Sequence, residues 1–146
     1  MTSLLRSPRE TLDGYVILPR LIDKVRLHAR GTLPPEYLPQ LLAPEPALDG
    51  RFIAFTGLDA EALRAAILAS PDDPAILTWV ERHAKPHTAG EKRAWAEAID
   101  AYRPDAQRAA RRAQNYPTVA ARFDVGGMSV FDVIDLDEGR IDRPTR

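Results

Sequence analysis

The sequence predicts an all-α fold, in which residues 1–146 form a compact single domain of five to seven short helices joined by proline-rich loops. Helix-starting signals recur about every 12–18 residues, and no hairpin signal is found between them. Thirteen prolines and eight glycines divide the chain into short units. A chain of 146 residues is long enough to bury a hydrophobic core and has the usual length of one domain.

The N-terminal third contains one main helix. Ser7 begins a capping-box sequence, Ser-Pro-Arg-Glu, which predicts a short helical turn. Pro19 lies in the first turn of the main helix, and Gly31 follows as a C-terminal cap. Residues 32–50 are proline-rich and predict a loop with one helical turn near residues 38–42.

Two further helices are indicated by N-cap residues. Asp59 precedes a helix over residues 60–70. Asp72 or Asp73 caps the next helix, in which Pro74 stands at the start and which ends before Pro86.

The C-terminal part continues the helical pattern. Thr88 and Glu91 form a capping box that begins a helix reaching about residue 103. Residues 105–115 predict another helix, in which an alanine stripe favours close packing while the arginines point into water. Ser129 is placed to cap a last helix, although the pattern of residues 130–137 also permits a strand.

Composition narrows the classes of function. Twenty basic and 21 acidic residues give a formal net charge of −1, so no general positive field draws in nucleic acid or an anionic membrane. The absence of cysteine excludes disulfides, thiolate nucleophiles and cysteine-ligated metals. No signal-peptide pattern or spanning apolar run is found, which predicts a soluble, cytoplasmic protein that binds neither nucleic acid nor membrane.

The polar face of the first main helix, residues 18–31, is unusually rich in charge. Six basic or acidic side chains fall within three turns: Arg20, Asp23, Lys24, Arg26, His28 and Arg30. Three interpretations remain open, namely a solvated surface, a network of structural ion pairs and the wall of a site. Isolated ion pairs on an exposed helix contribute only about 0.2–0.5 kcal/mol each, so a solvated face would gain little from them.

Two segments of the chain, "SPRETLDGYVILPRLIDKVRLHARGTL" and "ALDGRFIAFTGLDAEAL", resemble a family of small bacterial proteins described only as a domain of unknown function. The matching positions are Ser7-Pro8-Arg9, Gly14-Tyr15-Val16, Leu18-Pro19-Arg20, Asp23-Lys24, Arg26 and Leu48-Asp49-Gly50-Arg51-Phe52. The family usually has Cys-Pro before the Leu-Asp pair, where this chain has "APEPALDG".

The resemblance implies a shared polar cluster that joins the first helix to a loop at residues 48–52. Its members would be Arg20, Asp23, Lys24, Arg26, Asp49 and Arg51. Because Asp23 and Arg51 come from the two matching segments, we expect them to approach each other or to share a partner.

Two hypotheses for function follow from this cluster. In the first, a polar cleft beside the first main helix binds or transforms a small anionic ligand. The residues that would hold the anion are Arg20, Lys24 and Arg51, with Arg26 beside them. Asp23 or Asp49 would act as acid/base, and Tyr15 and His28 are secondary candidates. These assignments leave open whether the protein is an enzyme. In the second, the protein is a non-catalytic interaction or oligomerisation module, which allows a homo-oligomer.

No metal or cofactor site is indicated by the sequence. His83 and His87 have a helical ligand spacing, but Pro86 lies between them and disrupts a shared helix face. The acidic run that begins at Asp135 resembles a calcium loop, but Gly139 comes one position too early and Arg146 stands where the final glutamate is required.

Overall fold

Helices make up most of the computed structural model, which describes residues 4–145. The α-helices are α1 (Leu18–Ala29), α2 (Leu48–Thr56), α3 (Ala60–Ala69), α4 (Asp73–His83), α5 (Ala89–Ala101), α6 (Ala106–Asn115), α7 (Pro117–Ala120) and α8 (Val130–Asp137). Two 3₁₀-helices, η1 (Pro35–Gln40) and η2 (Val125–Gly127), lie between them. The mostly helical fold is therefore confirmed, whereas the expected number of helices, five to seven, is smaller than the number found.

A small antiparallel hairpin precedes α1, and the statement that no hairpin signal is found in the sequence is wrong. Strands β1 (Thr11–Leu12) and β2 (Tyr15–Val16) pair with Thr11 opposite Val16. The turn between them has positive φ at both Asp13 (49°) and Gly14 (84°). Asp-Gly is a strong signal for this two-residue hairpin turn, because both residues tolerate the left-handed region.

The helix boundaries follow the predicted caps. The side chains of Asp59, Asp72 and Asp105 each accept a hydrogen bond from the backbone N–H three residues later, at 2.8–3.0 Å. Thr88 and Glu91 form the reciprocal capping box. Such caps satisfy backbone donors that the first helical turn leaves without partners.

Two more predictions concern the caps at Ser129 and Ser7, and only the first is confirmed. Ser129 caps residues 130–137 as a helix, which decides against the strand. Ser7, in contrast, begins a turn closed by the hydrogen bond from the Glu10 N–H to the Ser7 carbonyl (3.1 Å) and is not followed by a helix. The Ser7 hydroxyl instead donates to Asp135, 128 residues later.

The 48–52 segment, expected as a loop, is the beginning of α2. The N–H of Leu42 in the preceding loop is bound by the carboxylate of Asp49, at 2.9 Å. The loop and the first turn of α2 therefore form one packed unit. Gly57, with φ of 71°, ends this helix.

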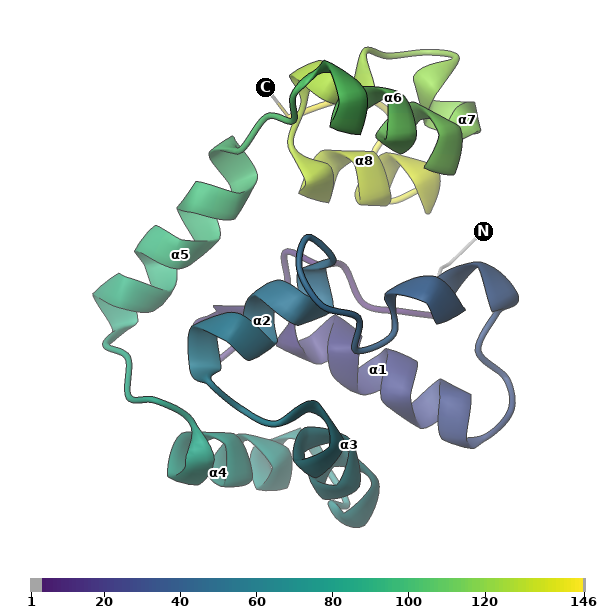
Figure 1. Cartoon of the computed structure of the whole chain (residues 1–146). Coiled ribbons are helices and arrows are strands. Elements are labelled where there is room, and N and C mark those ends of the chain that lie inside the picture. The colour runs from purple at the N-terminus through teal and green to yellow at the C-terminus, as the bar shows by residue number, and fades with distance from the viewer. Residues whose placement is uncertain (1–3, 146) are drawn as a thin grey trace.

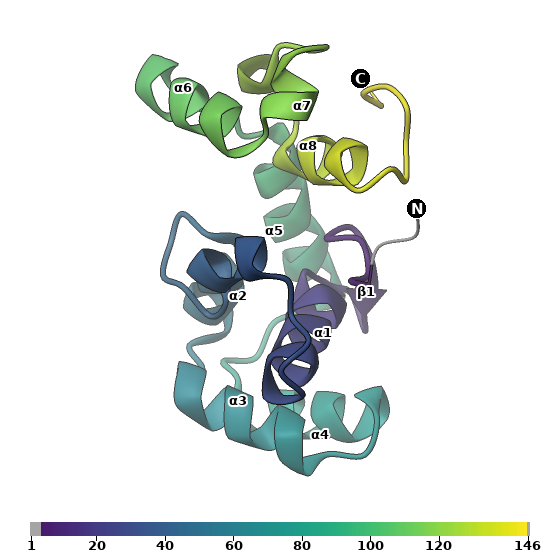
Figure 2. The ribbon, with the colours of Figure 1, turned by 90° about the vertical axis from the view of Figure 1, so that its right-hand side faces the viewer.

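The core surrounds α1. Its side chains Leu21, Ile22 and Val25 are fully buried and belong to the same apolar cluster as Phe52 of α2 and Leu63 of α3. Figures 1 and 2 show α1 to α4 on one side of the molecule and α6 to α8 on the other, with α5 running between them. No helix within residues 4–145 is long and apolar enough to cross a membrane.

A second, smaller apolar cluster holds the α6–α8 side together. It contains Val119, Val125, Met128 and Val133. Helix α6 packs against η2, where a Cβ added to Gly126 would lie only 2.8 Å from the Cβ of Ala109. This contact agrees with the close packing expected of the alanine stripe.

Candidate functional site

The predicted cluster on α1 is largely a set of internal ion pairs. The Lys24 Nζ lies 2.7 Å from the Asp49 Oδ1, and only 4% and 0% of these two side chains are exposed. Burial lowers the pKa of Lys24, and the neighbouring carboxylate offsets only part of this effect. The pair fixes α1 to α2 inside the protein.

Arg20 makes the second internal pair. Its guanidinium donates two hydrogen bonds to the carboxylate of Glu138, at 2.9 and 2.6 Å, and one to the backbone carbonyl of Arg6. Burial by itself would lower the pKa of Arg20, but the bidentate bond to Glu138 outweighs it and the pKa is raised. For Glu138 the signs are opposite. Burial by itself would raise the pKa of this carboxyl, but the hydrogen bonds from Arg20 outweigh burial and the pKa is lowered.

The single acidic residue of α1, Asp23, is bound by Arg6. The carboxylate accepts from both the backbone N–H (2.8 Å) and the guanidinium (3.0 Å) of Arg6. Arg6 and Arg26 also lie 2.6 and 3.5 Å from the carboxylate of Asp73. The expectation that Asp23 and Arg51 approach each other or share a partner is wrong, since among the interactions of residues 4–145 Asp23 is bound by Arg6 whereas Arg51 lies over the ring of Tyr102.

The two secondary candidates lie apart from each other. Tyr15 is fully buried, with its ring 5.5 Å from that of Phe52 and with the Lys92 ammonium 4.1 Å above it. His28 is half-buried where α1 faces α3, and its Nδ1 is 3.3 Å from a guanidinium nitrogen of Arg64. Of the three interpretations of the α1 face, the structural network is the one that the contacts describe.

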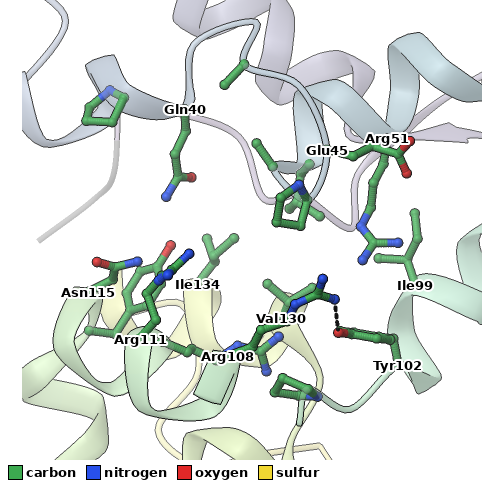
Figure 3. A pocket seen from close by; sticks show the side chains of 18 of the residues that line it. Gln40, Glu45, Arg51, Ile99, Tyr102, Arg108, Arg111, Asn115, Val130 and Ile134 are labelled. Carbon is green, nitrogen blue, oxygen red and sulfur yellow. Dashed lines mark hydrogen bonds between the residues drawn. The ribbon is translucent and has the colours of Figure 1, made fainter. Parts of the chain in front are cut away.

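A cleft of about 470 Å³ opens elsewhere, between the segment 39–51 and α6 (Figure 3). Its floor is apolar and includes Leu48, Ile99 and Ile134. One wall is the proline-rich segment, with Pro44 and Pro46, and the other is the polar face of α6. A volume of this size lies within the range of small-molecule sites.

Four arginines line this cleft: Arg51, Arg108, Arg111 and Arg112. Among the described residues of the lining, Glu45 has the only carboxylate, which leaves these residues with an excess of three positive charges in a chain of net charge −1. None of the four arginines forms an ion pair with an acidic residue of the described chain, unlike Arg20 on α1. We name these four residues the arginine set.

Contacts with neighbouring groups position three members of the arginine set. Arg112 donates to the backbone carbonyls of Val125 and Met128, at 3.0 and 3.1 Å. Burial lowers the pKa of Arg112, and no carboxylate is near enough to reverse it. Arg108 donates to the Tyr102 hydroxyl at 3.1 Å, and the guanidinium carbon of Arg51 lies 5.2 Å from the centre of the same ring.

Only Arg51 of the predicted site residues lines this cleft. The arginines of α6 could be recognised in the sequence from their i, i+3 and i+4 spacing, but they were expected to point into water. The opposite wall, a proline-rich segment 60–70 residues earlier in the chain, gives no local signal that it faces them.

The comparison with protein families agrees with the resemblance found in the motifs. A search of curated proteins finds no match to this chain. One family model, described as Domain of unknown function (DUF5069), matches residues 2–140, which is nearly the whole sequence. The chain therefore belongs to the DUF5069 family.

Proposed function

We propose that this protein binds a small anionic ligand in the cleft between the segment 39–51 and α6. The observation that supports the proposal is the arginine set, four guanidinium groups around one cavity without a carboxylate partner among the described residues. Elsewhere in the fold, Arg6, Arg9, Arg20 and Arg140 are each paired with acidic side chains.

Guanidinium groups suit this role because each presents several N–H donors in a planar fork that matches an oxyanion. Bringing like charges together in a partly buried cavity opposes folding, and a bound anion relieves that repulsion. The cleft thus has the chemical character of an anion site, with an apolar floor that can contact the rest of the ligand.

The α1 network gives this site its shape. Asp49 holds Lys24 with one carboxylate oxygen and the Leu42 N–H with the other, and this fixes the segment that forms the proline-rich wall. Arg51 lies two residues after Asp49 on the same helix. We therefore propose that the ligand binds in this cleft and not beside α1. Asp23 and Asp49 then have structural roles, and no catalytic role is assigned to them.

The alternative, an interaction or oligomerisation module, has less support. The exposed large apolar residues within residues 4–145 are Leu4, Leu38 and Leu68, which belong to three separate parts of the chain. Single exposed apolar residues are usual on soluble proteins, whereas a docking face needs a contiguous patch.

Thermal melting in pyrophosphate tests the proposal. At constant ionic strength, pyrophosphate should raise the melting temperature above its value in chloride, because a ligand that binds only the folded state stabilises it. Arg111→Gln should reduce this shift. Arg93→Gln is the matched control, since Arg93 is exposed on α5 and does not line the cleft. No shift, or equal shifts in both variants, would contradict anion binding at this site.

A further inference from the structure

Tyr102 holds two members of the arginine set on opposite walls of the cleft. The guanidinium of Arg51, from α2, lies over its ring, and the guanidinium of Arg108, from α6, donates to its hydroxyl. Figure 3 shows both arginines reaching this tyrosine, which follows directly after α5. Three elements therefore meet at one polar end of the cleft.

The two arginines are positioned before any ligand binds. A cation over an aromatic face and a hydrogen bond to a hydroxyl both limit the rotamers of a long side chain, so less conformational entropy is lost on binding. Arg108 uses one guanidinium nitrogen on Tyr102, which leaves its other N–H groups for a ligand.

The charge at this end suits a phosphate monoester better than a carboxylate. Two guanidinium groups without acidic partners in the described part of the chain offer two positive charges from two directions. A phosphate monoester has a charge of about −1.5 to −2 at pH 7 and three acceptor oxygens. A single carboxylate has one negative charge and would leave one of the arginines uncompensated.

The rest of the cleft suits a ligand that is larger than an inorganic ion. Its floor of Leu48, Ile99, Val130 and Ile134 is apolar, and the cavity of about 470 Å³ extends well beyond the space of one phosphate group. Figure 3 shows Gln40, Arg111 and Asn115 at the end of the cleft away from Tyr102. An apolar or aromatic body would cover the floor and exclude water from it.

We infer that the ligand is a small organic phosphate, whose phosphate lies between Arg51 and Arg108 and whose apolar or aromatic body lies on the floor of the cleft. This inference rests on the proposed anion binding and specifies its ligand class. Tyr102 is a positioning residue in this arrangement, since it acts through the two arginines.

Isothermal titration calorimetry with three probes tests the ligand class. The probes are inorganic phosphate, benzoate and phenyl phosphate, each at the same ionic strength and at pH 7.5. Phenyl phosphate should bind at least about tenfold more tightly than either of the others, because only it has both the doubly charged group and the aromatic body.

Four variants test the placement. Arg51→Gln and Arg108→Gln should each weaken the binding of phenyl phosphate about tenfold, and Arg93→Gln, which removes the same charge outside the cleft, should change it less than about twofold. Tyr102→Phe keeps the ring and removes only the hydroxyl, so it should weaken binding by an intermediate factor. Arg108 is exposed on α6. Melting temperatures of the free variants that are unchanged or higher will show that the fold is intact, since removal of one arginine lowers the repulsion among like charges.

The outcomes separate this inference from the proposal on which it rests. Binding of none of the three probes would overturn both. Binding of phosphate and phenyl phosphate with equal affinity, reduced by Arg111→Gln, would retain the anion site and overturn the aromatic or apolar body. Tight binding of phenyl phosphate that Arg51→Gln and Arg108→Gln reduce no more than Arg93→Gln does would overturn the placement at Tyr102.

Discussion

Individual charged residues in this protein are paired across long distances in the sequence. Lys24 meets Asp49, 25 residues later, and Arg20 meets Glu138, 118 residues later. The sequence could indicate a network of charges around α1, because six basic or acidic residues lie within residues 20–30, but it could not name Glu138 as a partner. No periodicity or local spacing relates residues that far apart.

Glu138 should make the free energy of unfolding depend on pH in the acidic range. Its folded-state pKa lies below the usual 4.5, since the bonds from Arg20 outweigh its burial. The unfolded state therefore binds the proton more tightly, so the stabilisation is complete above about pH 4.5 and is lost as the pH falls through the folded pKa.

Glu138→Gln tests this linkage. At pH 7 the variant should be less stable by about 3–5 kcal/mol, because it leaves the buried Arg20 charge without its carboxylate. The difference from the wild type should shrink as the pH is lowered below 4.5, where protonation removes the same charge. Urea unfolding between pH 3 and pH 7 measures both quantities, and a difference that does not change with pH would contradict the linkage.

At the scale of elements, the starts of the helices were the most predictable feature. Each cap joins residues two or three positions apart, so the sequence contains the whole interaction, as at Asp59 and Thr88. The hairpin is equally local in its Asp-Gly turn, but its strands have only two residues each, too few to show the alternating pattern that predicts a strand. The start of α2 at Leu48 lacks a side-chain cap, which explains why a loop was expected there.

Gly50 is the residue through which α2 meets the proline-rich wall. A Cβ added there would lie 2.3 Å from both the Glu45 backbone nitrogen and the Pro44 carbonyl carbon. Backbone atoms cannot move aside as a flexible side chain can, so the segment would have to leave the helix. Nothing in the local sequence pattern reveals this close approach.

Gly50→Ala should therefore destabilise the protein by about 3 kcal/mol or more and should weaken pyrophosphate binding, because the wall of the cleft moves. Gly90→Ala is the matched control. A Cβ at Gly90 meets its nearest neighbours at 3.8 Å, so this helical substitution should stabilise the protein by about 0.4–1 kcal/mol. Chemical denaturation measures both changes, and equal effects would contradict the close contact.

At the scale of the whole molecule, the question is whether the two apolar clusters unfold together. Helix α8 belongs to both, since Phe131 and Ile134 lie in the larger cluster and Val133 in the smaller one. The ion pair of Arg9 with Asp132 (2.6 Å) adds a polar link between the N-terminal segment and the same helix. The sequence predicts a single domain from chain length alone, whereas these contacts give a physical reason for cooperative unfolding.

Val133→Ala should reveal that cooperativity. Val133 is fully buried in the smaller cluster, and its truncation should destabilise the fold by about 1–3 kcal/mol. Both tryptophans, Trp79 and Trp95, lie in helices before α6 and pack against the larger cluster. If the domain is single, the denaturation midpoint from tryptophan fluorescence should shift as far as that from far-UV circular dichroism.

The exposed Thr118 on α7 provides the control for this comparison, since Thr118→Ala should change the stability by less than about 0.5 kcal/mol. If the two clusters were separate domains, the two probes would disagree. Loss of the α6–α8 helices would lower the dichroism midpoint of Val133→Ala, while the fluorescence of the distant tryptophans would keep the wild-type midpoint. Coincident shifts are expected because α8 cannot leave the smaller cluster without removing Phe131 and Ile134 from the larger one.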